Sequence, residues 1–83
     1  MLVKVLGPGC KNCAALEQAT QEAIDRLGLD ATVEKVTDYP TIAAYGVMST
    51  PALVIDDQVV SSGRVLTATG VAELLTAAAA HRS

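Results

Sequence analysis

Residues 2–13 read LVKVLGPGCKNC, and this stretch organises the rest of the chain. It joins an apolar run, a turn rich in glycine and proline, and the pair Cys10 and Cys13, spaced CxxC where a helix is expected to begin. A cysteine in the first turn of a helix faces backbone N–H groups without partners and the positive end of the helix dipole, and both favour the thiolate. Cys10 is therefore the candidate nucleophile, and Cys13 is placed to attack a disulfide that Cys10 forms. The stretch predicts a redox site.

The size and composition of the chain limit what else it can contain. Its 83 residues suffice for one small domain, placed at 1–83, and leave no room for a separate substrate or cofactor domain. Hydrophobic residues make up 51% of the chain and charged residues 18%, which is typical of a packed globule rather than a disordered segment. A net charge of -3, with Tyr39 and Tyr45 as the only aromatic residues, provides no phosphate-binding surface or stacking platform. We therefore expect no nucleic-acid partner.

The N-terminal segment carries neither a basic leader nor an apolar stretch of signal length. We accordingly expect a cytoplasmic protein that does not associate with membranes. Both cysteines of the chain belong to the CxxC pair, and the loop between them is too short to restrict the unfolded chain appreciably. In a reducing compartment this pair is expected to be catalytic or metal-binding rather than a structural disulfide.

The first half of the chain predicts a βαβ unit. Residues 2–6 form an apolar strand interrupted only by Lys4, and helical spacing follows from residue 11 to a C-cap at Gly28. Residues 31–36 then provide a second strand, parallel to the first. The buried stripe of the helix is expected at Leu16, Ala19 or Thr20, Ala23 and Leu27.

The second half predicts a short helix, a β-hairpin and a final helix. Asp38 is suited to cap the short helix, Pro40 fits its first turn, and Gly46 ends it. Strands at 52–55 and 58–62 meet at a turn, and Thr67 or Thr69 caps the last helix. The buried stripe of that helix is Val71, Leu74, Leu75 and Ala78. The order predicts an α/β fold in which one four-stranded mixed sheet has helices on both faces.

Several of these residues together resemble the thioredoxin fold. Cys10 and Cys13 follow the first strand, Thr50 and Pro51 precede the third, and Gly63 follows the fourth. More narrowly, the chain is similar to small prokaryotic thioredoxin-like redox-active disulfide proteins, which lack the N-terminal strand and helix of larger members. The resemblance implies a βαβαββα fold with a cis Pro51 beside the cysteine pair. It also implies that Cys10 attacks, Cys13 resolves, the Thr50 backbone pairs with a substrate protein and Gly63 keeps the rim of the site low.

The same resemblance implies a function. The protein would be a monomeric thiol–disulfide oxidoreductase that passes electrons from a thioredoxin-reductase-like donor to disulfide-containing target proteins, with no bound cofactor or metal. A rival interpretation is a soft-metal module that holds Cu(I) or Zn by the CxxC thiolates. Such modules resemble a βαββαβ order and need no proline facing the cysteines, whereas this chain ends in a helix. A third possibility is an iron–sulfur cluster shared between two subunits with added thiols.

Three further side chains have alternative interpretations. Lys11 is a candidate for lowering the pKa of Cys10, although an exposed ammonium is screened by water and salt. Lys4 stands where thioredoxins keep a buried aspartate, and it is either a proton carrier beneath the site or, as we favour, a strand-end lysine that reaches solvent. Met48 is either a soft contact for substrates or a core methionine that fills a gap.

Overall fold

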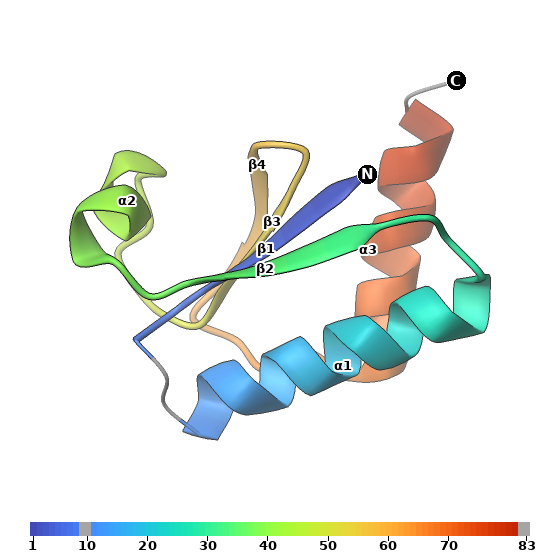
Figure 1. Cartoon of the computed structure of the whole chain (residues 1–83), viewed down its shortest axis with the longest axis horizontal. Helices are drawn as coiled ribbons and strands as arrows, with labels where there is room; N and C mark the ends of the chain where they lie inside the picture. The colour runs from blue at the N-terminus through green and yellow to red at the C-terminus, as the bar shows by residue number, and fades with distance from the viewer. Residues whose placement is uncertain (9–10, 82–83) are drawn as a thin grey trace.

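The computed structural model describes residues 1–8 and 11–81, and along them the secondary-structure elements follow in the order that the sequence predicts (Figure 1). These elements are β1 (Leu2–Leu6), α1 (Lys11–Leu27), β2 (Thr32–Val36), α2 (Tyr39–Ala44), β3 (Ala52–Ile55), β4 (Gln58–Ser62) and α3 (Ala68–His81).

The strands form a mixed sheet in the order β2-β1-β3-β4. Strand β1 pairs in parallel with β2, from Leu2 opposite Thr32 to Leu6 opposite Val36, and pairs antiparallel with β3 on its other side. Strands β3 and β4 form an antiparallel hairpin. Its turn is the predicted Asp56 and Asp57, both with a positive φ of the kind a tight hairpin turn requires. The βαβ unit, the hairpin and the mixed sheet are thus confirmed.

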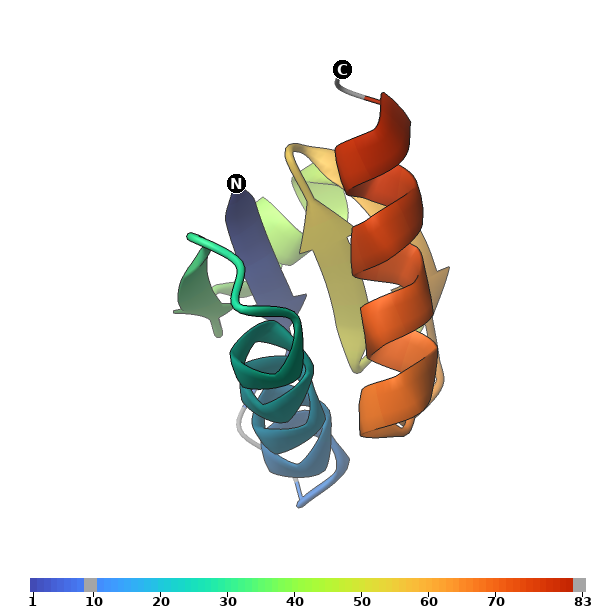
Figure 2. The same cartoon turned by 90° about the vertical axis from the view of Figure 1, so that its right-hand side faces the viewer.

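Helices cover both faces of this sheet, because the central strands are apolar on both sides. Figure 2 shows α1 and α3 side by side on one face and α2 behind the strands on the other. Val3 and Val5 of β1 belong to the core shared with α1 and α3, whereas Leu6 packs with Ile42 of α2. The alternation follows from the two-residue period of a strand, and it places β1 and β3 at the centre of two cores.

The packing of α1 differs from the predicted stripe at one end. Leu16, Thr20 and Ala23 are buried as expected, but Leu27 is 39% exposed and Ile24 is buried in its place. Leu27 lies in the last turn of α1, where Gly28 ends the helix with a φ of 63°, and the neighbouring Leu29 contributes to the core instead. The prediction for Leu27 was therefore wrong, because periodicity does not indicate where a helix passes beyond its packing partners.

The N-terminus of α2 gives a test based on pH. The Asp38 carboxylate accepts hydrogen bonds from the Thr41 hydroxyl at 2.6 Å and from the Thr41 backbone N–H at 3.0 Å, and these bonds lower the pKa of Asp38. A lowered folded-state pKa means that the stabilisation is present above the ordinary Asp pKa and is lost as pH falls through the folded value. We expect Asp38→Ala to lower the melting temperature near neutral pH but to have little effect once the pH is below the folded-state pKa of Asp38, where the carboxyl is protonated in both states. Asp38→Asn, which keeps a capping oxygen, serves as the control. An equal loss at both pH values for Asp38→Ala would contradict the assignment.

Candidate active site

The site lies at the edge of the sheet where β1 and β2 end and where α1 and β3 begin (Figure 1). Gly7 directly follows β1, and its backbone N–H donates to the Val36 carbonyl at the end of β2 over 2.8 Å. Pro51 directly precedes β3, and its carbonyl accepts a hydrogen bond of 2.9 Å from the N–H of Gly63. One of these backbone bonds thus joins the ends of β1 and β2, and the other joins the residue before β3 to the residue after β4.

Cys13 lies in the first turn of α1 and points at this edge. Its exposed fraction is only 2%. A Cβ atom built on Gly7 would overlap the Cys13 sulfur, and the same position is 3.9 Å from the Cα atom of Pro51. The Cys13 sulfur therefore packs against the backbone of Gly7, next to Pro51. Cys10 falls outside the described residues.

The segment before β3 forms the rim of the site. The Thr50–Pro51 peptide bond is cis, Pro51 is buried and Thr50 is exposed. Gly63 has a φ of 70°, and a Cβ atom there would lie 3.0 Å from the Cβ atom of Ser49. A side chain at position 63 would therefore crowd Ser49 beside Pro51, and the positive φ of Gly63 also favours glycine there.

Met48, just before the rim, is 99% exposed. The interpretation as a core methionine was therefore wrong. Met48 belongs to neither core cluster, whereas the preceding Val47 packs against the core on the α2 side. Val65, two residues after Gly63, is also an exposed apolar side chain.

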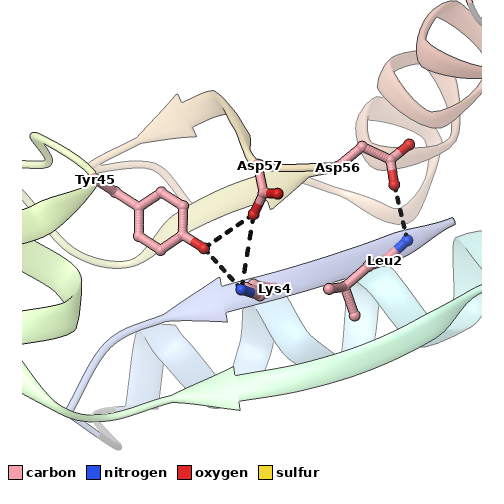
Figure 3. A network of polar contacts seen from close by, with 5 residues as sticks. All are labelled: Leu2, Lys4, Tyr45, Asp56 and Asp57. Carbon is pink, nitrogen blue, oxygen red and sulfur yellow. Dashed lines mark hydrogen bonds and ion pairs between the residues drawn. The ribbon is translucent and has the colours of Figure 1, made fainter.

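We expected Lys4 to reach solvent, but its side chain is mostly buried and its ammonium is bonded within the protein. Its ammonium donates to the Tyr45 hydroxyl over 2.7 Å and lies 3.8 Å from the Asp57 carboxylate, to which Tyr45 in turn donates over 3.3 Å (Figure 3). The hydrogen bond to Tyr45 raises the pKa of Lys4 above its ordinary value, and the charge of Asp57 adds to the effect. Only 19% of the lysine side chain is exposed. These contacts link the middle of β1 to the residue after α2 and to the β3–β4 turn.

The Lys4 contacts lie on a different face from Cys13. Lys4 alternates with Val3 and Val5, which face α1 and α3, so its side chain lies on the face that α2 covers. Lys4 is also three residues before Gly7, or about 10 Å along an extended strand. Lys11, the other candidate modulator, is exposed in the first turn of α1.

This arrangement leads to a prediction that separates stability from redox chemistry. Lys4→Met keeps the aliphatic stem but leaves the Tyr45 hydroxyl and the Asp57 carboxylate without their cation. We expect the variant to melt at a lower temperature and to keep the midpoint potential of the cysteine pair. Tyr45→Phe is the matched control, because it removes both hydrogen bonds of the tyrosine hydroxyl, keeps the ring and leaves the Lys4–Asp57 ion pair. Thermal unfolding and redox titration measure the two properties, and a shifted potential in Lys4→Met would assign Lys4 to the redox site.

Sequence reasoning did not identify Gly7, Ser49 or Tyr45 as neighbours of the predicted residues. A signal for Gly7 was present, since a glycine at the junction between a strand and a helix indicates a close approach. No comparable signal exists for Ser49 and Tyr45, whose contacts depend on the path of the loops around α2.

Two further features concern metal binding and membrane insertion. Over 1–8 and 11–81, no group of three or more His, Cys, Asp and Glu side chains is arranged to hold a metal ion. Across the same residues, none of the helices combines the length and the apolar character that a membrane span requires.

The fold and this edge define a small α/β protein with a thioredoxin-like architecture. The chain belongs to the thioredoxin family: the family described as "Thioredoxin domain" matches residues 1–76. It is similar to a thioredoxin of Methanothermobacter thermautotrophicus, with 33% identity over 75 residues that span 90% of this chain and 97% of that protein. It is also similar to a thioredoxin of Methanocaldococcus jannaschii, with 34% identity over 65 residues, or 78% and 74% of the two chains. The chain is therefore a thioredoxin-like redox protein, of a family whose general activity is thiol–disulfide exchange.

Proposed function

We propose that the protein is a thiol–disulfide oxidoreductase in which Cys10 attacks the disulfide of a target protein and Cys13 resolves the mixed disulfide. The observation that carries this proposal is the burial of the Cys13 sulfur against Gly7, beside Pro51, in a chain of the thioredoxin family. A resolving thiol has to attack only a sulfur that is brought to it, and burial protects it from other reactions.

The proposed reaction transfers two electrons in two exchange steps. The Cys10 thiolate attacks one sulfur of the target disulfide, the target S–S bond breaks, and the second target sulfur leaves as a thiolate. Cys13 then gives up its proton and attacks the Cys10 sulfur, which breaks the mixed disulfide and releases the first target sulfur as a thiolate. The target thiolates take up the protons that the cysteines lose. A reductase that supplies two electrons returns the Cys10–Cys13 disulfide to the dithiol.

The rim offers the surface on which a target protein would dock. Thr50 is exposed directly before Pro51, and Met48 and Val65 place exposed apolar side chains on the segments that lead to Pro51 and away from Gly63. An extended segment of a target can pair with exposed backbone at such a position and place its disulfide near the cysteines. Methionine adapts to differently shaped partners because it is flexible and polarisable.

The proposal is tested by titrating the Cys10 and Cys13 pair against glutathione redox buffers while the metal content of the same sample is measured. We expect a single two-electron midpoint in a sample without bound metal. Cys10→Ser is the matched control and should show no midpoint for an intramolecular disulfide. Stoichiometric Cu(I) or Zn retained through the titration, with no defined midpoint, would support the metal-binding interpretation instead.

A further inference from the structure

Gly7 differs from the other described glycines in what an added Cβ atom would meet. A Cβ atom on Gly7 would overlap the Cys13 sulfur and would lie 3.1 Å from the Cys13 Cβ atom. At Gly70, by contrast, the nearest atom to an added Cβ is 3.5 Å away, and at Gly28 and Gly46 no atom lies within 4 Å. Among the described glycines, Gly7 is thus the one at which a cysteine sulfur occupies the space that a side chain would fill.

Backbone conformation does not explain the glycine at this position. Gly28, Gly46 and Gly63 have positive φ values that favour glycine, and Gly7 does not. No positive φ therefore calls for glycine at position 7, and the space that Cys13 takes up is what excludes a side chain there.

The backbone of Gly7 is also poorly able to move away. Its N–H is bonded to the Val36 carbonyl over 2.8 Å, and the preceding Leu6 is paired with Val36 on one side and Ala52 on the other. Leu6 is itself fully buried. A side chain at position 7 would therefore displace the Cys13 sulfur more readily than it would displace the central strand.

We propose that Gly7 is a positioning residue that sets the depth of the Cys13 sulfur. The glycine lets the sulfur sit against the end of β1, where Gly7 and Pro51 shield it from solvent and from thiols other than the one delivered to it. This inference rests on the proposed role of Cys13 as the resolving thiol. It adds that the protection of Cys13 depends on Gly7, the residue that directly follows β1, and not on α1 alone.

The first test measures the reactivity of Cys13 alone. In a Cys10→Ser background, Cys13 is the only thiol, and its rate of labelling by iodoacetamide in the folded protein reports its accessibility. We expect Gly7→Ala to increase that rate by about tenfold, a ratio that corresponds to about 1.4 kcal/mol. Gly70→Ala is the matched control, because an added Cβ atom there would make only ordinary van der Waals contacts, the nearest at 3.5 Å, and alanine is favoured over glycine in a helix. An unchanged rate in folded Gly7→Ala would overturn the proposal.

The second test is a double-mutant cycle on stability. If Gly7→Ala is destabilising because its methyl group meets the sulfur, removing the sulfur by Cys13→Ala should relieve most of the loss in melting temperature. If Gly7→Ala alone fails to fold, the proposal requires Gly7→Ala/Cys13→Ala to fold. An equal loss in both backgrounds, or a double variant that is also unfolded, would show that position 7 needs glycine for a reason other than Cys13.

These tests are independent of the redox titration. Labelling of Cys13 and thermal unfolding need no redox partner, so the role of Gly7 can fail while a two-electron midpoint is measured, and the reverse outcome is equally visible. If the Gly7 tests succeed and no two-electron midpoint is found, Gly7 still positions the Cys13 sulfur, but the cysteines serve a function other than thiol–disulfide exchange.

Discussion

Cys13→Ser is expected to accumulate covalent adducts with disulfide-bearing proteins in a cell lysate, whereas Cys10→Ser is expected to carry few. With Cys13 replaced, Cys10 still attacks a target disulfide, but the thiol that releases the mixed disulfide is gone. The adducts should be released by dithiothreitol, and mass spectrometry should place them on Cys10. Neither variant should reduce a protein disulfide through a complete cycle. Non-reducing electrophoresis of the two variants, at equal protein concentration, measures the difference.

The soft-metal interpretation predicts the opposite pattern for the same pair of variants. If both sulfurs are ligands, each substitution should weaken metal binding to a similar degree and no asymmetric trapping should occur. Equal adduct levels in the two variants, together with tight metal retention by the unmodified protein, would therefore contradict the redox assignment. The unmodified protein is the necessary control, because a working Cys13 should leave it with few adducts.

The second large effect concerns the order in which the two cysteines are alkylated. In the reduced protein near neutral pH, iodoacetamide should label Cys10 before Cys13, by at least about tenfold in rate, because Cys10 is expected to be the more exposed and more ionised thiol. Cys13 should be slow because its side chain is buried against Gly7. Brief labelling followed by mass spectrometry of the separated peptides measures both rates.

Unfolded protein provides the control for this measurement. In denaturant the helix and the packing against Gly7 are absent, so the two cysteines should react at similar rates. If Cys13 were labelled first in the folded protein, the assigned roles of the two cysteines would have to be exchanged. If the order persisted in denaturant, local sequence rather than the fold would account for it.

Most of the secondary structure could be predicted because the signals are local. The strand pattern of residues 2–6 gives way to helical spacing from residue 11, and Gly28 ends α1 with the expected positive φ. Asp38 caps α2 with Pro40 in its first turn, and Thr67, one of two candidates, caps α3 through a bond of 3.1 Å to the N–H of Gly70. Each of these features depends on residues within one or two helical turns of one another, so the local sequence is enough to predict it.

The incorrect predictions share a different origin. Leu27 continues an apolar stripe, but the stripe extends beyond the core that α1 meets. Met48 is apolar yet almost fully exposed, although its neighbour Val47 packs against the core on the α2 side. Lys4 finds its main partner at Tyr45, 41 residues away along the chain. Composition and periodicity carry no information about neighbours at that separation.

The amino-acid sequence was sufficient for the order of the elements, the mixed sheet with helices on both faces, the CxxC pair and the resemblance to the thioredoxin fold. The contacts that make up the site required the folded chain. The sulfur of Cys13 packs against Gly7, which lies beside Pro51, because β1 is the strand between β2 and β3, so the starts of α1 and β3 lie at the same edge. Local propensity determines where a strand begins and ends, whereas pairing between distant strands determines which side chains meet, and that pairing is a property of the assembled core.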